Sequence, residues 1–198
     1  MAGNRNVVAR LDNLRWELRL GVSTRGRVEV DYPDAHRYAS MNYSSIFETL
    51  HFLSPKPADT FIDIGSGRGR VLCCAARYPI TKVIGVDLTT AFCADASSNA
   101  ARMRGRRAPI VVHNVNATEF DYADGDVYYL FDPFGADTLT NVLEKIRDDR
   151  GDKPVRFAYA NPTHEIAFTT QPWLERYEFW DKAKTGGEHS VSFYRTKA

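Results

Sequence analysis

The sequence predicts an α/β fold in which helices cover both faces of a mostly parallel sheet. From residue 59 onward, short apolar runs alternate with segments whose apolar residues recur at helical spacing. The first run, Phe61 to Ile64, leads into a glycine turn at residues 65–69, and a strand–turn–helix junction of this kind often binds a ligand. Near the end, two alternating segments flank Gly186-Gly187, which indicates an antiparallel hairpin. We therefore expect strand–helix units followed by a terminal hairpin.

The predicted strands are short and apolar, as strands covered on both faces are. They span residues 60–64, 82–86, 110–113, 127–131 and 155–160, with the hairpin segments at 174–181 and 190–195. Helices are expected at about 68–77 and 91–103, in a segment capped by Asp137, and in a short stretch from about Thr163 that ends before Pro172.

Residues 1–57 are predicted to form a helical extension in front of the core at residues 58–198. Four apolar residues recur at helical spacing: Val7, Leu11, Leu14 and Leu18. They share one face of a helix that ends near Gly21, and we expect this face to pack on the core. In this position an extension either packs against the core or serves as a lid or substrate surface.

The rest of the extension contains one further helix signal. Residues 22–33 are polar and irregular apart from a short alternation at Val28 and Val30. Ser45 to Glu48 then has a capping-box pattern, which predicts a helix that prolines 55 and 57 end.

Composition limits the classes of partner. Twenty-six basic and 25 acidic residues give a net charge of +1, which offers no general electrostatic case for nucleic acid or a membrane. The basic run from Arg102 to Arg107 either offsets a helix dipole or forms a patch for an acidic partner. The three cysteines include an adjacent pair, and no apolar stretch has the length of a membrane span, so we expect a cytoplasmic protein.

The residues around the glycine turn discriminate among nucleotide ligands. A dinucleotide fingerprint places a small residue where this chain has Arg70, and a phosphate-binding P-loop ends in Gly-Lys-Ser/Thr, which is absent here. Asp63 lies two residues before Gly65, at the carboxyl end of the strand. A carboxylate there repels a pyrophosphate but suits a ligand that bears an ammonium and a sulfonium.

With this acidic-x-glycine-x-glycine-x-glycine pattern, the chain resembles the class I S-adenosylmethionine-dependent methyltransferases over residues 58–162. The resemblance implies a Rossmann-like three-layer sandwich with a seven-stranded, mostly parallel sheet, and S-adenosyl-L-methionine as cofactor. It also implies that the segment at Tyr43 folds over the methionine end of the cofactor. The cofactor-binding residues that it implies are Tyr43, Asp63, Gly65, Ser66, Gly67, Gly69, Asp87, Leu88, Asn116, Ala117 and Asp132.

Two of these positions can be compared with the family's pattern. Asp87 ends the second strand, where the family has an acid that binds the ribose hydroxyls, and a carboxylate there is also the device that dinucleotide folds use. Asn116-Ala117 follows the third strand where the family usually has Asp-Ala beside the adenine; the Asn116 oxygen can still accept from the adenine amino group. Capping of a helix or turn is the alternative role for both polar residues.

The fourth strand ends in Asp132-Pro133-Phe134-Gly135, which resembles the Asp/Asn-Pro-Pro-aromatic motif of methyltransferases that act on nitrogen, with one proline missing. Methyl transfer is an in-line displacement, so the enzyme must mainly align the acceptor lone pair. Asp132 can accept an N–H bond of the acceptor, and Phe134 can hold a cationic or planar group. Alternatively, Asp132 caps the turn and Phe134 belongs to the core.

Tyr159 and Asn161 end the fifth strand, where ligands bind in open α/β sheets. Asp132, Tyr159 and Asn161 are therefore the candidate catalytic residues, although Asn161-Pro162 is also a common helix start. We expect no metal site, because the five histidines lack ligand spacing, and no hydrolase, because no Gly-x-Ser-x-Gly elbow occurs.

The sequence thus predicts a methyltransferase that acts on a nitrogen of a protein, a peptide or a small molecule. An RNA or DNA methyltransferase, a nicotinamide-dependent oxidoreductase and a non-catalytic S-adenosylmethionine-binding regulator are the alternatives. The acceptor class and the oligomeric state are not predicted.

Overall fold

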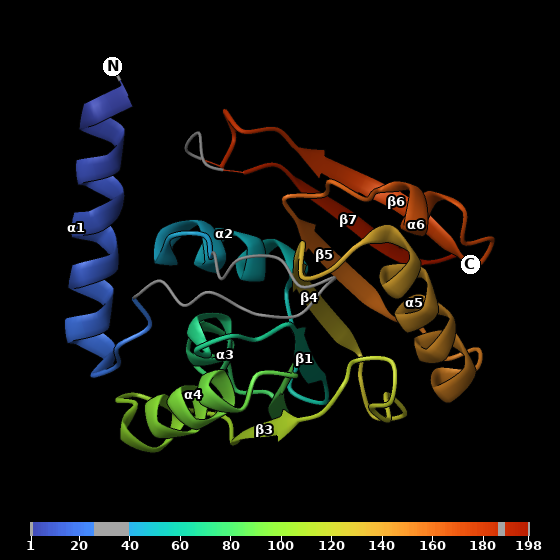
Figure 1. Ribbon diagram of the computed structural model, residues 1–198, viewed down its shortest axis with the longest axis horizontal. Coiled ribbons are helices and arrows are strands. Elements are labelled where there is room, and N and C mark those ends of the chain that lie inside the picture. Colours follow the sequence, from blue (N-terminus) through green and yellow to red (C-terminus); the bar gives the residue numbers. More distant parts are fainter. Residues whose placement is uncertain (1, 26–39, 186–188, 198) are drawn as a thin grey trace.

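Seven strands form one sheet in the order β3-β2-β1-β4-β5-β7-β6 (Figure 1). The structure is a computed structural model and describes residues 2–25, 40–185 and 189–197. The five strands from β3 to β5 are parallel, and β7 runs antiparallel to both β5 and β6. The predicted fold class, with its terminal antiparallel hairpin, is confirmed.

The elements lie close to their predicted positions. The strands are β1 (Thr60–Ile64), β2 (Lys82–Asp87), β3 (Ile110–Asn114), β4 (Val127–Phe131), β5 (Arg156–Ala160), β6 (Leu174–Trp180) and β7 (Val191–Thr196). The helices are α1 (Ala2–Leu20), α2 (Tyr43–Leu53), α3 (Arg70–Ala75), α4 (Thr90–Arg102), α5 (Ala136–Arg150) and α6 (Ile166–Thr169).

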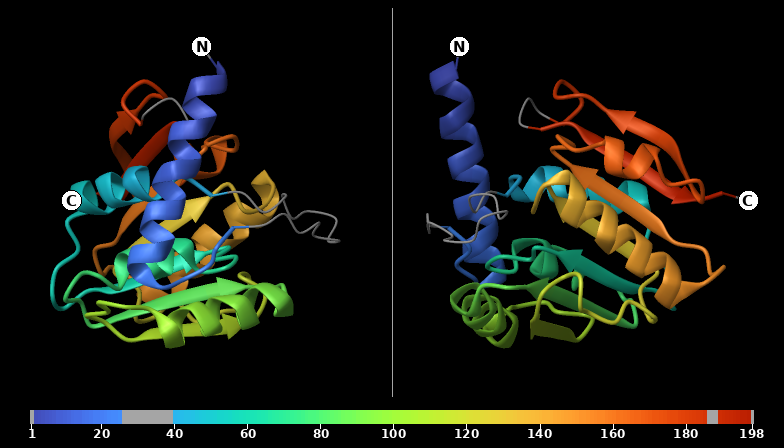
Figure 2. Two further views of the ribbon diagram at one scale, coloured as in Figure 1. Left: turned by 90° about the vertical axis from the view of Figure 1, so that its left-hand side faces the viewer. Right: turned by 45° about the vertical axis from the view of Figure 1, so that its right-hand side comes forward.

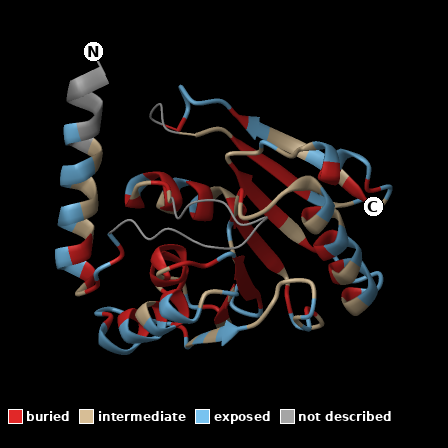
Figure 3. Ribbon diagram, viewed as in Figure 1, coloured by how far each residue is buried: buried red, intermediate tan, exposed pale blue. Residues whose placement is uncertain are grey.

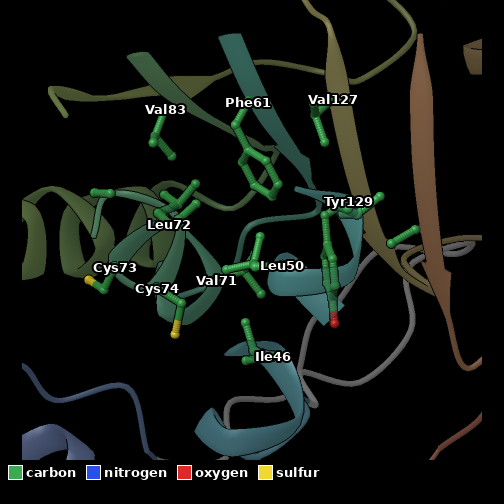
Figure 4. Close-up of a cluster of buried hydrophobic side chains, with 14 of the residues drawn as sticks. Ile46, Leu50, Phe61, Val71, Leu72, Cys73, Cys74, Val83, Val127 and Tyr129 are labelled. Carbon is green, nitrogen blue, oxygen red and sulfur yellow. The ribbon is translucent and has the colours of Figure 1, made fainter. Parts of the chain in front are cut away.

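Helices cover both faces of the sheet, and the central strands alternate their buried side chains between two cores. Phe61 of β1 packs in the core beneath α2 and α3, whereas Ile62 packs in the core beneath α5 and α6. Figure 2 shows these layers from two further directions. In Figure 4, Leu50 of α2 and Val71 of α3 meet Phe61 in the first core. Each helix layer therefore braces the strands from its own side.

Two predicted helix starts are wrong. Helix α2 begins at Tyr43 because the Asn42 side chain accepts a hydrogen bond from the backbone of Ser45 at 2.9 Å, so Asn42 is the cap and Ser45 lies inside the helix. Helix α5 is capped by Gly135, and Asp137 lies in its first turn, where its charge favours the positive end of the dipole. The turn at Gly186-Gly187 and the alternation at Val28 and Val30 lie outside the described residues.

Helix α1 packs by a face other than the predicted one. Trp16 stacks on Tyr43 with ring centroids 6.5 Å apart and lies 4.5 Å from Phe47, and Leu20 is buried. The large ring area of Trp16 holds α1 by this face. The predicted inward residues are exposed instead: Val7, Leu11, Leu14 and Leu18. In Figure 3, much of α1 is coloured as exposed. Among the described residues, no helix is both long and apolar enough to cross a membrane.

Candidate active site

The carboxyl ends of the parallel strands bring the predicted site residues to one edge of the sheet. The strand order reverses between β1 and β4, since the chain leaves β1 toward β2 on one side and continues from β4 toward β5 on the other. Ligands bind at such a switch point in open α/β sheets. The glycine turn follows β1 there, Asp87 ends β2, and Asp132 and Asn161 follow β4 and β5.

Two features of this turn require glycine: its backbone conformation and its close contact with the turn after β4. Gly65, Gly67 and Gly69 all have positive φ, at 77°, 50° and 78°. At Gly65, a Cβ atom would also lie only 2.6 Å from the Cβ of Pro133. The turn after β1 and the turn after β4 therefore meet in close backbone contact at the switch point.

Asp63, near the carboxyl end of β1, has a buried carboxylate. It is 3% exposed, and no hydrogen bond between described residues reaches its side chain. Burial, and secondarily the charge of Asp87, raise the pKa of Asp63 well above its usual value. The hydroxyl of Ser66 in the neighbouring turn is also buried without a partner in the described structure. The described protein groups therefore leave hydrogen-bonding capacity of the Asp63 carboxylate and the Ser66 hydroxyl unused.

Asp87 joins β2 to the glycine turn. Its carboxylate accepts a hydrogen bond from the Gly67 backbone at 2.8 Å and another from the Thr89 backbone at 2.8 Å. Burial raises the pKa of Asp87, and the two backbone bonds and the Thr89 side chain act in the opposite direction. A carboxylate offers about four acceptor sites, so this side chain can stabilise the turn and still accept from a ligand.

A second group of polar side chains lies at the ends of β4 and β5. The buried Asp132 carboxylate accepts from the hydroxyls of Tyr159 at 2.8 Å and Thr163 at 2.6 Å through one oxygen. Its other oxygen accepts from the Asn161 side chain at 3.2 Å. Burial raises the pKa of Tyr159, and the carboxylate of Asp132 adds to that effect, so the phenol stays a proton donor. These four residues, the Asp132 cluster, bring together all three predicted catalytic residues.

The two strand ends in this cluster have strained backbones. Asp132 has φ of 40° and Asn161 has φ of 52°, both in the left-handed region that non-glycine residues seldom occupy. Such conformations persist where surrounding contacts enforce them, and they occur often at active sites. Here the bond between the two side chains and the bond from the Asn161 backbone to the Ser190 carbonyl, at 2.8 Å, hold the pair in place.

Comparison with known proteins agrees with this arrangement. Residues 61–148 match the family described as a methyltransferase domain. The chain carries a class I methyltransferase domain. S-Adenosylmethionine is accordingly its cofactor, and the match spans the glycine turn, Asp87 and the Asp132 turn.

Three similar solved structures are methyltransferases with different acceptors. An RNA methyltransferase from Salinibacter ruber, in complex with S-adenosyl-L-homocysteine, has a TM-score of 0.61 and 16% identity over 80% of this chain and 92% of its own. An S-adenosylmethionine-dependent O-methyltransferase from Thermotoga maritima has a TM-score of 0.59 and 19% identity over 87% of this chain and 68% of its own. A ribosomal protein L11 methylase from Lactobacillus delbrueckii subsp. bulgaricus has a TM-score of 0.56 and 17% identity over 77% of this chain and 77% of its own. No curated protein sequence matches the chain.

The residues at the switch point fit the cofactor of such a methyltransferase. S-Adenosylmethionine carries an ammonium and a sulfonium, and the unpaired Asp63 carboxylate is the buried anion that can face a cation. Glycine at position 65 lets the turn after β4 pack directly on the glycine turn, because a side chain there would clash with Pro133. Ser66, Gly67 and Gly69 lie in the same turn, so they fit the predicted binding set.

The adenine side of the methyltransferase site differs in detail from expectation. The Asn116 oxygen accepts two hydrogen bonds from Thr118, each at 3.0 Å, so it serves the turn that was its alternative role. Only its side-chain nitrogen is then suited to an adenine, as a donor to a ring nitrogen. Ala117 is half-buried next to it, and Leu88, after β2, is 41% exposed.

Tyr43 does not present a surface to a ligand. Its side chain is fully buried, its hydroxyl bonds to Thr24 at 3.0 Å, and the Arg70 guanidinium lies 5.0 Å from the ring centroid. Arg70 itself donates to Thr24 at 2.9 Å and to the Met41 carbonyl at 2.9 Å. Tyr43 and Arg70 therefore attach the N-terminal extension to α3, and the predicted cofactor contact of Tyr43 gains no support.

Sequence reasoning missed two members of the site. Thr163 lies two residues after Asn161 and could have been included as a strand-end hydroxyl. His189 Nδ1 lies 3.2 Å from the Asn161 oxygen, and its ring packs edge-on to Phe131 with centroids 4.8 Å apart. Because the Asn161 nitrogen donates to Asp132, its oxygen requires a protonated Nδ1, which fixes the tautomer of neutral His189. No local pattern links His189 to β4 or β5.

Proposed function

We propose that this methyltransferase transfers the methyl group of S-adenosylmethionine to a nitrogen of its acceptor, and that Asp132 aligns that nitrogen. The observation that supports this most is the position of the Asp132 carboxylate. It lies in the turn whose Pro133 packs against Gly65, and three side chains from the end of β5 and the loop after it bond to it. The carboxylate thus lies between the cofactor turn and the strand end where an acceptor would enter.

Methyl transfer requires alignment of the acceptor nitrogen more than it requires proton transfer. The cofactor supplies an electrophilic methyl group on a sulfonium, and the acceptor nitrogen must point its lone pair along the carbon–sulfur axis. The Asp132 carboxylate accepts hydrogen bonds, and the Asn161 side chain donates to one of its oxygens at 3.2 Å. In this proposal the acceptor N–H donates to the same carboxylate. Tyr159 and Thr163 fix the other oxygen. An N–H held in this way leaves the nitrogen lone pair directed elsewhere, toward the methyl group.

The protonation state of the acceptor also matters for methyl transfer. An amine attacks through its lone pair, so it must be neutral before it reacts. The methylated ammonium that forms then loses its proton to solvent, and the sulfonium leaves as a neutral thioether. Phe134, half-buried beside the turn, provides an apolar contact for the acceptor.

The nucleic-acid alternative has weaker support. The basic run at residues 102–107 connects the end of α4 to the start of β3, so it lies toward the amino ends of the strands. The Arg107 backbone bonds to the Ala76 carbonyl and the Arg104 backbone to the Leu20 carbonyl, both remote from the Asp132 cluster in the fold. An RNA methyltransferase is among the similar structures, but identities below one fifth carry only the fold.

Labelled-methyl transfer into fractionated cell lysate tests this proposal. The protein is incubated with S-adenosylmethionine that carries a labelled methyl group, and the labelled product is hydrolysed and identified as an N-methyl, O-methyl or C-methyl compound. We expect N-methyl products with wild-type protein, loss of label with Asp132→Asn, and no change with Asp137→Asn, an exposed aspartate on α5. Label on oxygen or carbon, or an active Asp132→Asn variant, would contradict the proposal.

A further inference from the structure

The outward face of α1 is a continuous apolar surface. Its residues, called the α1 seam, are Val7, Leu11, Leu14 and Leu18, exposed by 52%, 60%, 38% and 68%. The helix packs on the protein by the opposite face, through Trp16 and Leu20. Large apolar residues that are exposed singly need no explanation, but four along one helix face indicate a contact surface.

The width of the seam indicates what covers it. At about 3.6 residues per turn, the four residues span roughly 60° of the helix circumference. A helix that lies on a membrane, or packs into a core, has an apolar face of about 100° or more. The 4-3-4 spacing of the seam instead matches the a and d positions of a coiled coil. The expected occupant is therefore another helix.

The charges beside the seam select the kind of helix. Arg10 and Arg15 flank it on its two sides and are exposed. The acidic residues of α1 are engaged elsewhere: Asp12 binds Ser44 at 2.6 Å, and Glu17 is buried and paired with Arg25. Pairing of α1 with a second copy would place arginine opposite arginine in either orientation. A partner helix with acidic residues beside its apolar residues is complementary instead.

A hollow continues the seam at the carboxyl end of α1. Its lining includes the seam residues Leu14 and Leu18, the exposed Arg25 and Arg104, and the buried Glu17. Arg25 is already paired with Glu17, so Arg104 is the basic side chain that the hollow adds to the seam. A helix that follows the seam would reach this hollow with its last apolar side chain.

We propose that the α1 seam binds an acidic amphipathic helix of a partner protein. The helix would carry apolar residues at 3-4 spacing against Leu11, Leu14 and Leu18, and Asp or Glu beside Arg10 and Arg15. This surface is separate from the methyltransferase site, so the proposal does not depend on the identity of the methyl acceptor.

Two designed helical peptides test the proposal with the full-length protein. Both carry leucine at a and d; one has glutamate and the other lysine at e and g, and fluorescence anisotropy measures their affinity. We expect the wild-type protein to bind the glutamate peptide at least 10-fold more tightly, and Arg10→Glu/Arg15→Glu to reverse this preference. Leu11→Ser/Leu18→Ser should weaken binding of the glutamate peptide at least 10-fold. Equal affinities, or no binding of the glutamate peptide, would overturn the proposal.

A control variant removes the effect of total charge. Arg147→Glu/Lys153→Glu changes the net charge by the same amount at two exposed residues on and just after α5, and it should leave the peptide preference unchanged. Sedimentation of the wild-type protein tests whether a second copy of the chain binds the α1 seam instead. A dimer that Leu11→Ser/Leu18→Ser dissociates would assign the seam to a second copy and contradict the proposal.

Discussion

The proposed cofactor side and the proposed acceptor side of this methyltransferase are built in different ways. The cofactor side consists of one continuous turn with three positive-φ glycines, and of two carboxylates, Asp63 and Asp87, at neighbouring strand ends. The acceptor side consists of side chains from separate segments that bond to one another around Asp132. The first depends on backbone shape and on carboxylates that have no cationic partner among the described residues, whereas the second depends on hydrogen bonds between side chains.

This difference predicts a separation of effects. Changes on the cofactor side should alter the affinity for S-adenosylmethionine, because its backbone and charges are available to the ligand. Changes in the Asp132 cluster should alter methyl transfer at constant cofactor affinity, because the carboxylate bonds to side chains at the end of β5. The cofactor contact that the resemblance implies for Asp132 is therefore not part of this proposal. The following substitutions test that separation, from the largest expected effect to the smallest.

Asp132→Asn should reduce the rate of methyl transfer about 100–1000-fold, the range for loss of one aligned charge-assisted contact. The new amide nitrogen would face a donor, either Asn161 or Tyr159, so the cluster would lose its alignment. Single-turnover transfer of labelled methyl to the acceptor measures this effect. A loss below 10-fold would show that Asp132 does not align the acceptor.

Gly65→Ala should weaken cofactor binding about 10–100-fold. The left-handed conformation costs about 1–2 kcal/mol for alanine, and the added Cβ would lie 2.6 Å from the Cβ of Pro133. Gly151→Ala is the matched control, since Gly151 also has positive φ but nothing lies within 4 Å of the added Cβ. Titration calorimetry of both variants compares them, and equal affinities would refute the role of the close contact.

Asp63→Asn should weaken cofactor binding about 10-fold, as loss of a charge-assisted contact does, and should also stabilise the ligand-free protein. Burial raises the pKa of Asp63, so the ionised carboxylate lowers the free energy of unfolding. The protonated carboxyl stabilises the fold at acid pH, and this stabilisation is lost as the pH rises through the pKa of the folded protein. A cationic ligand favours the ionised form, so wild-type affinity should rise with pH until Asp63 is ionised in the free protein.

Calorimetry in two buffers of different ionisation enthalpy detects the proton that wild-type protein releases on binding below that pH. Asp63→Asn should release none and should have a higher melting temperature without ligand at neutral pH. A variant that is both less stable and unchanged in proton release would refute the assignment of Asp63.

Tyr43→Phe should have the smallest effect. It removes the hydrogen bond to Thr24, which lowers the free energy of unfolding by about 1 kcal/mol, and it retains the ring beneath Arg70. Cofactor affinity should stay within about twofold, because the ring is fully buried. A tenfold loss of affinity in a folded Tyr43→Phe protein would restore Tyr43 to the cofactor site.

The same contrast explains what the sequence could predict. The strand at residues 60–64, the glycine turn and the carboxylates at 63 and 87 are encoded locally, by apolar runs and by residues that follow them at short spacing. Asp132 was predicted from the resemblance of its turn to a methyltransferase motif, and Tyr159 and Asn161 were predicted because ligands bind at the carboxyl ends of parallel strands. His189 was missed, because its contact with Asn161 depends on the antiparallel pairing of β7 with β5.

Two further predictions failed for a physical reason. Periodicity identified the apolar face of α1 but not its direction, because Trp16 and hydrogen bonds from α2 to Asp12 and Asn13 hold the opposite face inward. The pattern at Ser45 resembled a cap, but Asn42 had the competing side chain three residues earlier. A periodic pattern reports amphipathicity, and tertiary contacts decide which face is covered.

Calorimetric titration of S-adenosylmethionine into Asp87→Ala and Asp132→Asn tests the separation of the two sides most directly, and it needs no knowledge of the acceptor. We predict that Asp87→Ala weakens binding by about 1–3 kcal/mol while Asp132→Asn binds within about twofold of the wild type. Normal affinity in Asp87→Ala, or an equal loss in both variants, would contradict a cofactor side and an acceptor side that act independently.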